Sequence, residues 1–104
     1  ARDYQFNLAN DYEEIHPVDF KITSLYPNPF NASLVFKVRL KDVGHLKIDI
    51  LTLNGSIVSC LFDDFTTEKD VIIRWDPENI SSGPYLVNTN FEGKNIIKKV
   101  TYIK

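Results

Sequence analysis

Alternation of apolar and polar residues with a period of two constrains this chain more than any other feature. In residues 36–41 and residues 46–50, apolar side chains alternate with charged ones. Successive side chains on a β-strand point to opposite faces, so each segment has one buried and one solvated face. No comparable stretch shows the i, i+3, i+4 spacing of an amphipathic helix. The sequence therefore predicts an all-β protein with little or no helix.

Strand-like runs recur along the chain between turn-forming residues. We expect seven strands, at residues 19–25, 34–41, 45–52, 56–62, 70–75, 84–91 and 95–103. Seven short strands separated by turns predict an immunoglobulin-like antiparallel β-sandwich. The residues expected in its core are Phe36, Val38, Leu46, Ile48, Ile50, Leu53, Val71, Ile73, Trp75, Tyr85 and Val87.

The breaks between the runs have recognisable turn chemistry. Asn54-Gly55 is a strong hairpin signal because both residue types tolerate positive φ. Val43-Gly44 and Glu92-Gly93 predict two further tight turns. Polar residues predict connections at 63–64 and 66–69, and the prolines and small residues of 76–84 predict a longer loop.

Size and composition exclude several classes of protein. The 104 residues fit one domain, and 43% apolar with 25% charged residues is typical of a globular chain. A net charge of −2 argues against a nucleic-acid partner. No apolar run is long enough to insert into a membrane as a helix. Cys60 is the single cysteine, so no disulfide forms within the chain, and we interpret it as a small strand residue.

Residues 1–16 differ from the rest and include the acidic stretch around Asp11, Glu13 and Glu14. We interpret them as a linker or the tail of a preceding domain, with residues 17–104 as the sandwich. The alternation of Tyr4, Phe6 and Leu8 leaves a short extra strand open as an alternative.

The sequence offers no catalytic, metal or cofactor site. The histidines are His16 and His45, and His45 begins a strand with no carboxylate or nucleophile at a useful spacing. One cysteine and two histidines do not make a Cys/His metal site. The acidic residues at 63–64, 76 and 78 lack the regular pattern of a calcium loop. We therefore expect a protein that is not an enzyme.

Three segments stand out as candidates for recognition. In residues 26–31, Pro27 and Pro29 exclude helix and central strand, Asn28 and Asn31 favour turns, and Phe30 is placed rigidly as a lid over one end of the core. Gly83 permits a chain reversal after which Pro84 starts a strand and Tyr85 enters the core. Lysines gather near the C-terminus. The candidates for a sorting motif are Pro27, Asn28, Pro29, Phe30, Asn31, Gly83, Tyr85, Lys98, Lys99 and Lys104.

These segments, in this order, resemble the C-terminal sorting domains of type IX (Por) secretion cargo, which are similar to the immunoglobulin-like domain of the flagellar hook-capping protein. The resemblance spans residues 20–104. It rests on residues 26–31, 44–48, 53–58, 75–76, 82–85 and 98–104. The chain departs from the family at Ala32, where proline is usual, and at Pro84, where a small or β-branched residue is usual.

The resemblance implies a non-catalytic domain that directs a larger protein across the outer membrane of a Gram-negative bacterium to the medium or the cell surface. Its partners would be the secretion machinery and the parent protein upstream of this segment. The terminal lysines would then be read by that machinery, or they would only solvate an edge strand. The alternative function is a structural spacer or a carbohydrate- or protein-binding accessory module. A carbohydrate site would need exposed aromatic residues, for which the candidates are Tyr4, Tyr12, Tyr26 and Tyr102.

Overall fold

The computed structural model describes residues 20–23, 25 and 27–104, and in this part of the chain every regular element is a strand. The strands are β2 (Phe20–Ile22), β3 (Leu34–Leu40), β4 (Gly44–Leu51), β5 (Ile57–Thr66), β6 (Asp70–Trp75), β7 (Gly83–Phe91) and β8 (Lys94–Tyr102). The prediction of an all-β fold is therefore confirmed. The expected linker or extra strand in residues 1–16 lies outside the described residues.

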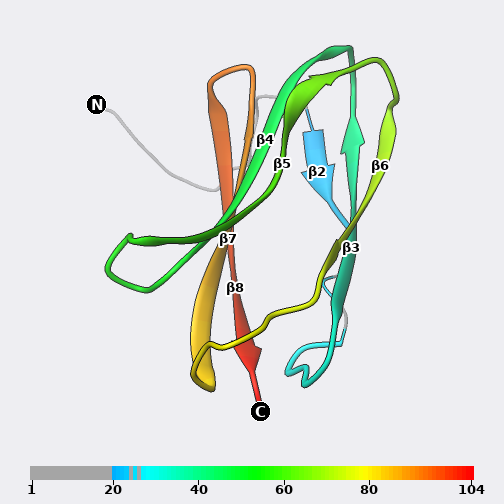
Figure 1. The fold of residues 1–104 in the computed structure, drawn as a ribbon. Helices are drawn as coiled ribbons and strands as arrows, with labels where there is room; N and C mark the ends of the chain where they lie inside the picture. Colours follow the sequence, from blue (N-terminus) through cyan, green and yellow to red (C-terminus); the bar gives the residue numbers. More distant parts are fainter. Residues whose placement is uncertain (1–19, 24, 26) are drawn as a thin grey trace, which may run out of the picture.

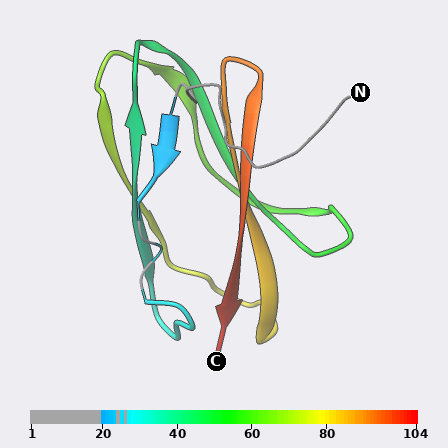
Figure 2. The same cartoon turned by 180° about the vertical axis from the view of Figure 1, so that it is seen from behind.

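The strands form two antiparallel sheets that face each other. One sheet has the order β2-β3-β6 and the other has the order β5-β4-β7-β8. Figure 1 shows the two sheets as separate layers, and the view from behind in Figure 2 shows the same arrangement. This architecture is an immunoglobulin-like β-sandwich, as the spacing of strands predicted. Every expected strand is present, with most ends shifted by only one or two residues.

The core lies between the sheets and follows the alternation seen in the sequence. In β3 the side chains of Leu34, Phe36, Val38 and Leu40 are buried, and the residues between them are more exposed. The register places Phe36 opposite Ile73 of β6. The other core residues that the sequence predicted are also buried, apart from Val71, which is half-buried, and one residue that is exposed.

The exception is Leu53, which was wrongly placed in the core and is 57% exposed. It lies in the tight turn between β4 and β5, where the Gly55 N–H donates to the carbonyl of Thr52 at 3.0 Å. Of Asn54 and Gly55, the glycine alone has a positive φ, of 96°. The expected hairpin is thus present, but its turn is not one in which both residues are left-handed. The hairpin projects from the body of the sandwich (Figure 1), so its tip contacts no core.

Strand β5 is longer than predicted, because Asp63 and Asp64 continue it to Thr66 instead of forming a polar connection. Both aspartates pair with β4, Asp63 opposite Lys47 and Asp64 opposite Leu46. β5 lies at the edge of its sheet, so the carboxylates remain solvated while the backbone keeps its ladder. Polarity alone therefore gave a wrong end for this strand.

Gly44 was expected in a tight turn, but it is the buried first residue of β4. A Cβ atom at this position would lie 2.8 Å from the ring of Phe91 and 2.8 Å from the side chain of Glu92. Glycine is required here by close packing. The turn expected at Glu92-Gly93 is confirmed, with φ of 49° and 85° at its two residues, a pair of left-handed conformations that matches the twist of a two-residue hairpin.

Three segments that are distant in the sequence meet at one end of the sandwich. They are residues 27–33 before β3, the loop 76–82 between β6 and β7, and the end of β8 (Figures 1 and 2). We call this the corner end, and we call residues 27–31 the corner. All the candidate recognition segments from the sequence reach this end.

Candidate functional site

The corner forms hydrogen bonds with the last strand. The Oδ1 atom of Asn28 accepts the N–H of Thr101 at 3.1 Å, and its Nδ2 atom faces the carbonyl oxygen of Lys99 at 3.5 Å. The N–H of Phe30 donates to the carbonyl of Thr101 at 3.0 Å. The Asn28 side chain therefore bonds a strand residue that is 73 positions away in the sequence.

Phe30 closes this end of the core as predicted. The side chain is only 2% exposed, and its backbone forms an isolated parallel bridge with Tyr102. The ring centroid lies 5.5 Å from that of Trp75 and 5.3 Å from that of Tyr102. An aromatic cluster thus holds the corner on its buried side, and the hydrogen bonds to β8 hold its backbone and the Asn28 side chain.

The segment from Gly83 to Tyr85 is a corner at the start of β7. Gly83 has a φ of 145°, which favours glycine, and Tyr85 is buried with its hydroxyl donating to the Ser81 carbonyl at 2.7 Å. Pro84 lies opposite Thr101, which directs both of its backbone groups to the corner. Pairing of β7 with β4 begins only at Leu86, so the missing N–H of Pro84 leaves no gap in a ladder.

The C-terminal lysines do not form one patch. β8 is the edge strand of its sheet, and its register places Lys98 opposite the buried Val87 and Lys99 opposite Leu86. Residues directly opposite each other share a face, so Lys98 points to the inner face and Lys99 to the outer face. Both side chains are exposed because β8 lies at the margin of the sandwich. The two residues that are neighbours in sequence therefore present charge in opposite directions.

The chain beyond β8 is fixed at the corner end. The N–H of Ile103 donates to the carbonyl of Phe30 at 2.8 Å. The N–H of Lys104 donates to the hydroxyl of Ser82 at 2.8 Å. Lys104 is exposed, yet its backbone is held between the corner and the 76–82 loop.

A polar network joins the corner end to β6. The guanidinium of Arg74 donates to both carboxylate oxygens of Asp76 at 3.1 Å and to the hydroxyl of Ser33 at 3.0 Å. The Ser33 hydroxyl also bonds Asp76. The hydrogen bond from Ser33, followed by that from Arg74, lowers the pKa of the Asp76 carboxyl below its ordinary value. No pattern in the sequence pointed to Ser33 or Arg74 as members of this network.

Polar pairs elsewhere do not make a catalytic arrangement. The register of β4 and β5 brings Asp63 to His45, with 2.6 Å between Oδ1 and Nε2, a partner that the sequence of β4 alone did not supply. Partial burial and the neighbouring Asp49 carboxylate raise the pKa of the Cys60 thiol, which makes it a weaker nucleophile. Within residues 20–23, 25 and 27–104, no group of three or more His, Cys, Asp and Glu residues is placed to hold a metal ion.

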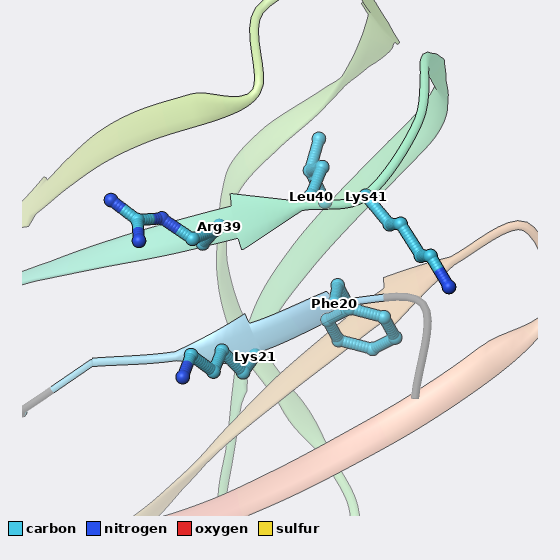
Figure 3. A pocket seen from close by; sticks show the side chains of 5 residues that line it. All are labelled: Phe20, Lys21, Arg39, Leu40 and Lys41. Atoms are coloured by element: carbon cyan, nitrogen blue, oxygen red, sulfur yellow. The ribbon is translucent and has the colours of Figure 1, made fainter. Parts of the chain in front are cut away.

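A hollow of about 350 Å³ lies at the opposite end of β3 from the corner. Figure 3 shows its lining side chains, which come from β2, from the end of β3 and from the residue after it: Phe20, Lys21, Arg39, Leu40 and Lys41. Arg39 is paired with Asp70 at 2.9 Å. The lining contains no hydroxyl, thiol, imidazole or carboxylate side chain, and none of the candidate recognition residues belongs to it.

The described residues also offer little to a carbohydrate ligand. Tyr102, one of the proposed platform residues, is only 7% exposed and packs against Phe30, so that proposal is wrong for this residue. Of the aromatic residues that the structure describes, Phe65 alone is largely exposed. Tyr4, Tyr12 and Tyr26 lie outside the described residues. No helix in the described part of the chain is long and apolar enough to cross a membrane.

Comparison with known families identifies this fold. A family model described as a secretion system C-terminal sorting domain matches residues 24–104, most of the chain. The chain belongs to this family. The match contains the corner, the start of β7 and all of β8, so the segments that form the corner end belong to the sorting domain. No curated protein and no solved structure matches the chain significantly.

Membership confirms the family resemblance drawn from the sequence and assigns a coarse role. The family is one of sorting domains rather than of catalysts, and type IX sorting domains are carried by larger exported bacterial proteins. Ser82 and Thr101, which were not among the candidate recognition residues, bond the candidate segments together, and Ser33 joins the corner end to Arg74 of β6. Their role depends on contacts across the fold and has no signal in the local sequence.

Proposed function

We propose that this sorting domain directs the export of the protein that carries it across the outer membrane of a Gram-negative bacterium. The corner and the end of β8 would be recognised by the secretion machinery as one surface. The parent protein would precede the domain and would be released or held at the cell surface. The likeness to the immunoglobulin-like domain of the hook-capping protein belongs to this proposal too.

The observation that carries the proposal is the pairing of the corner with β8. The exposed residues Pro27, Pro29 and Asn31 are held next to the end of β8 by the bonds of Asn28 and Phe30 to Thr101. A rigid recognition surface favours binding, because less free energy is lost in ordering its residues when the partner binds. The sorting domain provides this support from the buried side through the ring of Phe30.

The domain would act by recognition, without chemistry of its own. The family is one of sorting domains rather than of catalysts. His45 bonds Asp63 and Ser33 bonds Asp76, so these polar groups have partners within the fold. Lys99 on the outer face of β8 and Lys104 beyond its end would supply positive charge to the recognised surface. Exposed lysines contribute little to folding, so their charge is available for binding.

Export of a reporter tests this proposal. A reporter protein with all 104 residues at its C-terminus is expressed in a host with a type IX system, and the reporter in the medium and on the cell surface is measured. Changing Lys99 and Lys104 to Gln is expected to reduce export sharply without changing the melting temperature. The matched control changes Lys21 and Lys41 to Gln, which removes the same charge at the opposite end of the sandwich.

Three results would decide the matter. Loss of export in the Lys99/Lys104 variant and normal export in the Lys21/Lys41 variant would support recognition of the corner end. Normal export in both, with unchanged melting, would show that the terminal lysines only solvate an edge strand. Failure of the wild-type fusion to be exported at all would overturn the sorting proposal itself.

A further inference from the structure

The edges of the two sheets differ in how well they are protected. β2 has only three residues, and the pairing of β5 with β4 contains register shifts at Ile48/Asp49 and at Ile50/Leu51. Short strands and bulges hinder the addition of a further strand. β8, in contrast, has nine residues that pair with β7 in one uninterrupted register. Among the edge strands that the structure describes, β8 is the longest with uninterrupted pairing, since β6 of the other sheet has only six residues.

The corner covers one half of this edge. In an antiparallel sheet, backbone groups of alternate residues point to opposite sides of the strand. The bonds to the corner show that the outward groups of β8 belong to the alternate positions that include Lys99 and Thr101. The same alternation directs the N–H and C=O groups of Asn95 and Ile97 outward. No other residue in the part of the chain that the structure describes bonds these groups.

The side chains beside this open half indicate what would pair with it. Ile97 is 56% exposed on the outer face, opposite Asn88. Lys98 and Lys99 follow it, on the inner and the outer face. A strand added here would gain main-chain hydrogen bonds from the open edge. Its carboxylates would meet a lysine on either face, and an apolar residue would cover Ile97.

We propose that residues 95–99 of β8 accept an extended, acidic strand from a protein of the secretion machinery, by β-strand addition. This inference rests on the sorting function proposed above and specifies how the partner binds. The corner would set the register, because Asn28 and Phe30 already occupy the edge from Lys99 onward. The added strand would therefore end where the corner begins.

Charge argues for a foreign strand over a second copy of this chain. Two β8 strands paired antiparallel across the open half, with Ile97 opposite Ile97, would make the Lys98 side chains of the two copies diagonal neighbours, roughly 7–8 Å apart. Like charges at that separation destabilise a pair of strands. A strand with carboxylates would instead compensate the lysines. The open edge with its flanking lysines is thus suited to a partner of opposite charge.

A proline at position 97 tests the proposal directly. The N–H of Ile97 faces away from β7, so Ile97→Pro removes no bond of the existing ladder, and proline is tolerated at such edge positions. Ile96 stays extended, as the residue before proline prefers. The proline removes the central donor for an added strand and obstructs its approach. The matched control is Ile97→Thr, which shortens the apolar side chain but keeps the backbone donor.

Each variant is measured in the reporter export assay, with thermal melting of the 104-residue chain in parallel. Ile97→Pro is expected to reduce export about tenfold or more, as a loss of at least ~1.4 kcal/mol of partner binding would produce. Ile97→Thr is expected to be exported close to the wild-type level. Equal export of all three proteins would overturn strand addition, and so would equal losses in both variants, since the side chain would then be recognised instead of the backbone.

A second variant covers the case in which the proline prevents folding. Lys98→Glu reverses the charge on the inner face and is expected to reduce export about tenfold or more, by the same loss of partner binding. Lys98→Arg keeps the positive charge and is expected to be exported at the wild-type level. Normal export of Lys98→Glu would contradict an acidic partner. Sedimentation of the wild type provides the last check: a dimer that Ile97→Pro abolishes would mean that a second copy covers the edge. If export depends on Lys99 and Lys104 but not on Ile97 or Lys98, the sorting function stands and strand addition fails.

Discussion

The side chain of Asn28 takes the place of a neighbouring strand beside Thr101. Its Oδ1 atom accepts the Thr101 N–H at 3.1 Å, although the two residues are 73 positions apart in the sequence. The Phe30 N–H then takes the carbonyl of the same threonine at 3.0 Å. Both outward backbone groups of Thr101 are therefore satisfied by the corner. A segment at the start of the domain thus completes the edge of its last strand.

Replacing Asn28 with alanine is expected to destabilise the fold by about 0.5–1.5 kcal/mol, the usual net contribution of a hydrogen bond. The midpoint of urea unfolding should fall while the slope of the transition stays constant. Asn31→Ala is the control from the same corner, because Asn31 is exposed and bonds no other residue that the structure describes. It should change the unfolding free energy by less than about 0.5 kcal/mol. Equal losses in the two variants would show that the bond to Thr101 is not what stabilises the corner.

Trp75→Ala is expected to cost about 3–5 kcal/mol of unfolding free energy, as for other buried aromatic residues. Trp75 is 4% exposed, and its ring centroid lies 5.5 Å from that of Phe30 and 5.9 Å from that of Tyr85. Denaturant unfolding followed by circular dichroism measures this loss. A loss below about 1 kcal/mol, the range of surface changes, would contradict the burial of Trp75 between the sheets.

Tyr85→Phe removes one hydroxyl and keeps the buried ring. The hydroxyl donates to the Ser81 carbonyl at 2.7 Å, so we expect a loss of about 0.5–1.5 kcal/mol. Tyr102→Phe is the matched control, because its hydroxyl bonds no other residue in the described part of the chain. Thermal melting of the two variants compares the hydroxyls at equal ring burial. A larger loss in Tyr102→Phe would show that the bond to Ser81 does not fix the start of β7.

The Asp76 network predicts a dependence of stability on pH. Ser33 and Arg74 lower the pKa of Asp76 in the folded protein below its ordinary value of 3.8. A lowered pKa stabilises the fold above the unfolded-state value, and this contribution is lost as the pH falls through the folded-state value. Near neutral pH the wild type should therefore have a higher melting temperature than Asp76→Asn. This difference in melting temperature should narrow below pH 3.8.

Melting temperatures measured from about pH 2 to pH 7 test this prediction, because the contribution is lost only in the acidic part of that range. The side chains involved are exposed, so the difference should be small and should shrink in high salt. A difference that stays constant down to the lowest pH would mean that the charge of Asp76 does not stabilise the fold.

Much of the fold could be predicted from the alternation of residues. Phe36 and Val38 in one strand and Ile48 and Ile50 in another are buried as expected, because a period of two assigns each side chain to a face whatever the partner strand is. The turn at Glu92-Gly93 was also readable, since its conformation is set locally. The corner was recognised as rigid from its prolines, and Phe30 is its buried anchor.

Local pattern failed where a residue's position depends on distant parts of the chain. Leu53 is apolar, but it lies on a projecting hairpin and is exposed. Asp63 and Asp64 are polar, but they belong to an edge strand in which their side chains stay exposed to solvent. Gly44 has the composition of a turn, yet it is fixed by the ring of Phe91 across the sheet. None of these contacts is encoded by neighbours in the sequence.

The sequence by itself determined the strands, their buried faces and the family, because periodicity, turn chemistry and motif order are properties of neighbouring residues. Only the tertiary structure decided that the corner and the last strand lie side by side at one end of the sandwich. That arrangement depends on a backbone register that brings Asn28 to Thr101 and sends Lys98 and Lys99 to opposite faces. These hydrogen bonds join segments that are distant in the sequence and depend on how the two sheets pack, so no local sequence pattern predicts them.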